Sequence, residues 1–189
     1  MKSHYIRTTP VEVFRGEIVQ LWNAEHEAFR IELFGEEKPR IAIVRSGQKI
    51  KSSAQFPVKP GNTVQEVLEA WLADMPSSTA EMAAAALGLE KHLHTAISEA
   101  GRDLRYRLQT LKAILDGAHV IAFGDHDGVV NVTSVIIAAR EFAENYKQKA
   151  GEIPAFVVLD EGSSTGAVMA ADRVLKIKHG KIRELLVDY

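Results

Sequence analysis

The chain has 189 residues, of which 46% are hydrophobic and 25% are charged, and its formal net charge is −2. This length and composition suit a globular protein with a buried core and exclude a disordered or fibrous one. The absence of cysteine excludes disulfides, thiolate zinc sites, iron–sulfur clusters and cysteine nucleophiles. Since the sequence has neither a secretory signal nor a stretch apolar enough to cross a bilayer, we expect a cytoplasmic protein without a membrane partner.

The first sixty residues show the alternating pattern of β-strands. Phe29, Ile31 and Leu33 fall on one side of a strand, and Arg30 and Glu32 fall on the other. Similar segments are separated by short polar turns, which favour an antiparallel meander. They cover residues 11–22, 28–34, 40–45 and 49–58.

The middle of the chain is helical by its spacing. Apolar residues repeat at helical intervals over residues 64–75, and Thr63 with Glu66 forms a capping box at the start. Ser78 with Glu81 repeats this signature and opens an alanine-rich helix that Gly88 ends or interrupts. A later leucine seam suits either the core or a homodimer contact. Its members are Leu104, Leu108, Leu111 and Leu115.

The last third alternates between the two kinds of structure. The pattern predicts strands over 119–123 and 155–159 with a crossover helix over 132–147 between them, which favours a parallel pair. A hairpin follows over residues 173–187, with its turn at His179 and Gly180.

We therefore predict an α+β protein with an N-terminal antiparallel β-meander, central helices and a C-terminal α/β unit that ends in a β-hairpin. The predicted parts are a β-rich domain over 1–60, a helical region over 61–117 and an α/β unit over 118–189.

Residues 78–98 resemble a helix-turn-helix, with small residues on the first helix, Gly88 at the turn, and Leu93 and Ile97 facing inward on the second helix. The resemblance implies that polar residues of the second helix read base edges while nearby arginines bind phosphates. The DNA-binding residues would be Lys91, His92, Thr95, Ser98, Arg102, Arg105 and Arg107. The alternative is an ordinary pair of packed helices with a charged, solvated face.

Acidic residues follow both predicted strands of the last third. Asp125, His126 and Asp127 come after the first strand, and Asp160 comes after the second. Parallel strands would bring these groups to one edge of a sheet, where open α/β folds place their ligands. Carboxylates with an imidazole could hold Mg²⁺ or Mn²⁺ and activate water against a phosphodiester. The alternative is a pair of solvated turns rich in Asp and Gly.

The segment 108–142, with its Gly-Asp-His-Asp-Gly run, resembles the first motif of the DHH phosphoesterases, and residues 157–164 are similar to their second. The resemblance implies that Asp125, Asp127 and Asp160 are metal ligands. The chain departs from the family at Val129, where a further aspartate is expected, and it has no Asp-His-His sequence.

Residues 157–161 and 171–182 also resemble fragments of ABC-type ATPases that follow the Walker B strand. Against this resemblance, the chain has no Gly-x-x-x-x-Gly-Lys-Ser/Thr loop to bind phosphates, and the interval between the fragments is short for a helix. We therefore set it aside.

Three functional hypotheses follow. The first is a non-enzymatic DNA-binding regulatory or accessory protein that needs no cofactor. The second is a metal-dependent phosphoesterase that acts on nucleic acid or nucleotides and uses Mg²⁺ or Mn²⁺. The third is an assembly or interaction module without chemistry. A basic ridge, an acidic cleft or neither would distinguish them.

Overall fold

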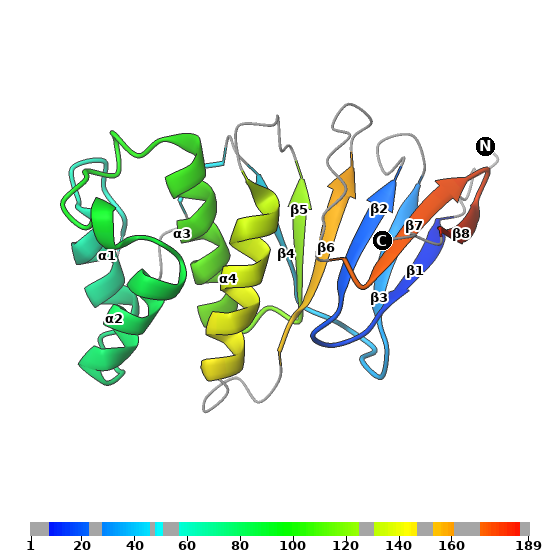
Figure 1. Ribbon diagram of the computed structural model, residues 1–189, viewed down its shortest axis with the longest axis horizontal. Helices are drawn as coiled ribbons and strands as arrows, with labels where there is room; N and C mark the ends of the chain where they lie inside the picture. The colour runs from blue at the N-terminus through cyan, green and yellow to red at the C-terminus, as the bar shows by residue number, and fades with distance from the viewer. Residues whose placement is uncertain are drawn as a thin grey trace, which may run out of the picture.

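The computed structural model describes residues 8–22, 28–45, 48–50, 57–124, 131–146, 153–160 and 171–185, without the side chains of Ser77 and Asp160. Within these ranges, strands and helices form a mixed α and β protein (Figure 1). The predicted α+β class is therefore confirmed. No helix in the described ranges is long and apolar enough to cross a membrane.

A six-stranded sheet forms the centre of the molecule, in the order β4-β5-β6-β2-β7-β8. Its first five strands are mutually parallel, and only β8 is antiparallel to its neighbour. The strands are β4 (Ile41–Arg45), β5 (Val120–Gly124), β6 (Ala155–Asp160), β2 (Ile18–Trp22), β7 (Arg173–Lys178) and β8 (Lys181–Leu185).

The central strand of this sheet comes from the start of the chain. In β2, Ile18 to Leu21 are all buried, because β6 and β7 flank the strand and both faces of the sheet are covered at this point. A continuous buried run is typical of an interior parallel strand. The predicted antiparallel meander is therefore wrong, since β2 pairs with strands more than 130 residues away along the chain.

A second, two-stranded sheet packs on one face of the first. It consists of β1 (Thr9–Val13) and β3 (Phe29–Leu33), which are parallel rather than antiparallel. Val11, Val13 and Leu33 of this sheet form a core with Val19 and Val157 of the central sheet. Sheet-on-sheet packing on this side explains why β1 buries alternate residues.

The helices cover the opposite face (Figure 1). Phe123, Phe156 and Val158 of the sheet point into a larger core with the helices. Helices α3 and α4 lie next to the sheet, and α1 and α2 lie beyond them. The helices are α1 (Val64–Trp71), α2 (Ser77–Ala86), α3 (Arg102–Leu115) and α4 (Val132–Asn145), with a 3₁₀ turn, η1 (Glu90–His92).

Local signals explain where these elements begin and turn. Thr63 caps α1 by accepting a hydrogen bond from the Glu66 amide, while the Glu66 carboxylate accepts one from the Thr63 amide, as the capping box predicts. The predicted cap at Ser78 is wrong, because α2 begins one residue earlier after Pro76 and has no side-chain cap. The predicted hairpin is confirmed: β7 and β8 meet at His179 and Gly180, both with positive φ.

The C-terminal α/β unit is also as predicted, since β5, α4 and β6 form a strand–helix–strand crossover whose strands are parallel neighbours. The division into parts at residues 60 and 117 remains a prediction, and strands from both sides of it share one sheet.

Candidate functional site

The carboxyl edge of the central sheet is the candidate site. Because the five parallel strands point the same way, their carboxyl ends lie along one edge (Figure 1). Open α/β sheets bind their ligands at this edge. Register places Arg45 beside Gly124 at the ends of β4 and β5, and places Trp22 beside Asp160 at the ends of β2 and β6.

The predicted acidic residues follow β5 and lie at the end of β6 in the sequence. Strands β5 and β6 are adjacent and parallel, which is the arrangement that convergence of their acidic turns requires. Asp125, His126 and Asp127 lie outside the described residues, as does the side chain of Asp160 at the end of β6. The residues that the structure describes include no cluster of three or more potential metal ligands. Convergence of the predicted set therefore remains a prediction.

Two helices begin on the same side of the sheet. Helix α3 precedes β5 and runs antiparallel to it, and helix α4 follows β5. Both helices therefore have their N-termini toward the carboxyl edge (Figure 1). Asn131 caps α4 by accepting a hydrogen bond from the Ser134 amide at 3.0 Å. The partial positive charge of a helix N-terminus favours anions nearby.

The helix-turn-helix prediction is wrong. Residues 90–98 contain η1 and turns rather than a second α-helix. Gly88, with φ of 63°, follows α2, and the segment beyond it is fixed by backbone hydrogen bonds to the start of α1. The Thr95 carbonyl accepts from the Val64 amide at 3.0 Å, and the Ile97 amide donates to the Asn62 carbonyl at 2.8 Å.

The residues assigned to base reading are consequently scattered. Lys91 and His92 are exposed on η1, while Thr95 is half-buried in the following turn. Ser98 is exposed, but its amide donates to the Pro60 carbonyl at 2.8 Å and its carbonyl accepts from Arg105 at 3.4 Å. These residues share no helix face that could enter a groove of DNA.

The arginines assigned to phosphates have different environments. Arg102 is exposed at the start of α3, and Arg105 is half-buried beside Ser98. Arg107 is 18% exposed and makes an ion pair with Asp103 at 2.7 Å. It also donates to the Leu87 carbonyl at 3.0 Å and to the Ser134 hydroxyl at 3.3 Å, which joins α2, α3 and α4. Arg107 therefore supports the fold by joining three helices.

The leucine seam lies within the chain. Leu104, Leu108 and Leu111 are buried in the core between the helices and the sheet, and Leu115 packs against that core. A homodimer contact through this seam is excluded, because its side chains already contact the rest of the same chain.

Sequence reasoning missed the importance of β2. The run Gly-Glu-Ile-Val-Gln-Leu-Trp contains four consecutive buried residues, a signal of an interior parallel strand that was available in the sequence. Only six residues separate β2 from β3, and they include no glycine, lysine, serine or threonine. The connection at this central position therefore lacks the residue types of a phosphate-binding loop.

No family model matches the chain, and no curated protein matches it. Solved structures are nevertheless similar in fold. An RNase-L inhibitor aligns with 95% of the chain at a TM-score of 0.52 and 17% identity. The archaeal ribosome recycling factor aABCE1, solved with the ribosomal stalk protein aP1, aligns with 94% at a TM-score of 0.52 and 15% identity. The chain spans 37% of each of these neighbours.

A metal-chelate type ABC transporter, in an inward-facing conformation, aligns with 90% of the chain and 72% of its own length, at 12% identity and a TM-score of 0.46. At these identities, the similarity to the RNase-L inhibitor and to aABCE1 shows the fold alone.

This fold corrects the functional hypotheses. The predictions of a DNA-binding regulator and of a DHH-like phosphoesterase are wrong, because the solved structures that share the fold are an RNase-L inhibitor and the ribosome recycling factor aABCE1 rather than proteins of those two classes. The expectation of no cofactor is wrong for the same reason. The DHH motif misled because a strand, an acidic turn, a crossover helix and a second strand recur in many α/β folds.

Proposed function

We propose that the chain is an ATP-binding cassette-like domain that binds a magnesium nucleotide at the carboxyl edge of its central sheet. The observation that carries this proposal is the adjacency of β5 and β6 in parallel, since acidic residues follow both strands. This edge is where open α/β sheets bind nucleotides. The absence of cysteine is compatible with a cytoplasmic setting, which we include in the proposal.

The chemistry of the available groups indicates which of them bind the metal and how the phosphates are held. Asp125, Asp127 and Asp160 supply carboxylate oxygens, which Mg²⁺ prefers, and the ion in turn coordinates the phosphates. Carboxylates alone repel phosphate. The residues after β2 offer no glycine-rich main-chain cradle and no lysine to offset this repulsion. Nucleotide binding should therefore depend on the metal more strictly than it does in a site with a phosphate-binding loop.

Isothermal titration calorimetry tests the proposal. We expect heat of binding when ATP or ADP is added with excess Mg²⁺, and none when EDTA replaces the metal. Asp127→Asn and Asp160→Asn should each weaken binding at least about tenfold, because each removes a charged ligand of the ion. Glu141→Gln is the matched control, since this exposed residue of α4 also loses one negative charge and lies outside the proposed site.

Equal heats of nucleotide binding with Mg²⁺ and with EDTA would contradict a role for the metal in binding the phosphates. No heat at about millimolar nucleotide would contradict the proposal as a whole.

A further inference from the structure

In the described part of the chain, one edge of strand β4 has no strand partner. Among the described strands, it pairs only with β5. The Arg40 carbonyl accepts a hydrogen bond from the Val120 amide at 3.1 Å and so faces β5. Because backbone groups alternate in direction along a strand, the N–H and C=O groups of Ile41 and Ile43 face away from β5. An open row of such groups is a template for another strand.

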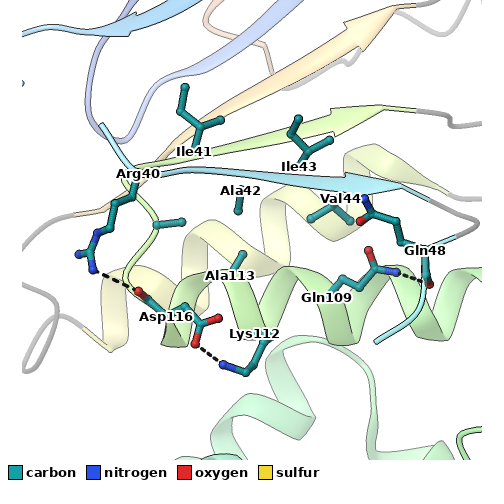
Figure 2. Close-up of a pocket in the computed structure, with 11 residues that line it drawn as sticks. Arg40, Ile41, Ala42, Ile43, Val44, Gln48, Gln109, Lys112, Ala113 and Asp116 are labelled. Carbon is teal, nitrogen blue, oxygen red and sulfur yellow. Dashed lines mark hydrogen bonds and ion pairs between the residues drawn. The ribbon is translucent and has the colours of Figure 1, made fainter. Parts of the chain in front are cut away.

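Apolar side chains accompany this edge. Ile41 and Ile43 are 42% and 43% exposed on the sheet face that β1 and β3 cover elsewhere. Ala42 and Val44 point the other way, toward α3 (Figure 2). An extended segment added beside β4 would therefore find apolar contacts on both of its faces.

A cavity of about 200 Å³ opens between the β4 edge and α3. Its walls include Ala42 and Val44 of the strand and Gln109, Lys112 and Ala113 of the helix (Figure 2). Lys112 is held in place, because it pairs with Asp116 and lies 5.8 Å from the centre of the Trp71 ring. The cavity is large enough for a small side chain.

Gln109 provides a specific polar group in this cavity. The residue is only 7% exposed, and its amide nitrogen donates to the carbonyls of Arg45 at 3.3 Å and Gln48 at 3.0 Å. Its amide oxygen is buried and has no hydrogen-bond partner in the described part of the chain. Figure 2 shows the nitrogen turned toward Gln48, with the oxygen on the opposite side of the amide. A buried acceptor without a donor costs stability, so a ligand that supplies a hydroxyl or amide donor is favoured.

Charge distinguishes between the occupants that this edge could take. Arg40 and Arg45 bracket the strand, Lys49 follows, and no acidic residue occurs between residues 40 and 50. Antiparallel pairing of β4 with a second copy of itself would bring the arginines of the two copies close together. This like-charge contact disfavours a second copy and favours a segment with acidic ends.

We propose that β4 binds an extended, acidic-ended segment of another polypeptide as an additional strand. The segment pairs with the backbone of Ile41 and Ile43, places its acidic ends near Arg40 and Arg45, and inserts a small hydroxyl side chain toward Gln109. Apart from Arg45, this lateral edge lies outside the carboxyl edge, and the proposal does not rest on nucleotide binding.

Fluorescence anisotropy with a labelled, C-terminally amidated peptide, Glu-Val-Thr-Val-Thr-Glu, tests the proposal on the full chain. We expect saturable binding, loss of binding when the backbone amides of the peptide are N-methylated, and loss when its glutamates are replaced by lysine. Replacing its threonines by valine should weaken binding several-fold, because the donor to Gln109 is removed.

Variants of the chain provide a second test of peptide binding at β4. Ile43→Glu should weaken binding at least about tenfold by repelling the acidic peptide, whereas Ile43→Lys should retain it. Ile137→Glu is the matched control, since Ile137 is 50% exposed on α4 and lies away from the edge. Circular dichroism should show that the variants fold, because Ile43 is exposed and its replacement leaves the core intact.

Several outcomes would overturn the proposal. Absence of binding at about millimolar peptide would do so, as would equal binding of the N-methylated peptide. A dimer in sedimentation velocity that Ile43→Glu dissociates would show that a second copy occupies the edge instead.

Discussion

At the scale of single residues, Arg107 shows how a basic side chain in a helical segment serves the fold. Its guanidinium reaches Asp103, the Leu87 carbonyl and the Ser134 hydroxyl, so one side chain joins three helices. Arg107→Ala should lower the free energy of unfolding by about 1–3 kcal/mol, because the Leu87 carbonyl and Asp103 lose a charged donor. Urea denaturation measures this change. Lys91→Ala is the comparison, since Lys91 is exposed on η1, and it should change stability by less than about 0.5 kcal/mol. Equal effects of the two substitutions would contradict a structural role for Arg107.

At the scale of elements, the two capping signatures of the sequence have different outcomes, and this difference can be measured. Thr63→Ala should lower the free energy of unfolding by about 0.5–2 kcal/mol, because Thr63 caps α1. Ser78→Ala should change it little, because α2 has no side-chain cap. Hydrogen bonds from Asn62 and from the Thr63 amide hold the pKa of Glu66 below its ordinary value of 4.5. A lowered pKa means that the stabilisation is present above the ordinary pKa and is lost as the pH falls through the lowered one. The difference in melting temperature between the wild type and Glu66→Gln should therefore narrow in acid. A cost for Ser78→Ala as large as that for Thr63→Ala would contradict these cap assignments.

At the scale of the whole molecule, the leucine seam of α3 connects the helices to the sheet. Leu108 is fully buried in the larger core, so Leu108→Ala should lower the free energy of unfolding by roughly 2–5 kcal/mol through lost contacts and a residual cavity. Because the seam faces the same chain, the melting temperatures of the wild type and of the variant should not change with protein concentration through this surface. Calorimetry over a wide range of concentrations measures both quantities. A change in the free energy of unfolding that is smaller than the experimental error would place Leu108 outside the core.

The sequence by itself determined the local structure, because periodicity, caps and turns depend on residues within a few positions of one another. The helix over 64–71, the crossover around α4 and the hairpin at His179 and Gly180 could all be predicted on these grounds. The same signals suggested where acidic residues would gather, because adjacency of β5 and β6 follows from a single crossover.

Only the tertiary structure decided how the strands of the first sixty residues pair. The largely apolar run of β2 indicates an interior strand, but it does not identify which strands are its neighbours. Its insertion between β6 and β7 depends on contacts with residues more than 130 positions away, and those contacts select the fold. The prediction of a recognition helix was wrong for a related reason. Backbone hydrogen bonds to the start of α1 hold residues 93–98 in a non-helical conformation. Local propensity contains no information on such long-range hydrogen bonds. These bonds determine which residues lie together at the carboxyl edge.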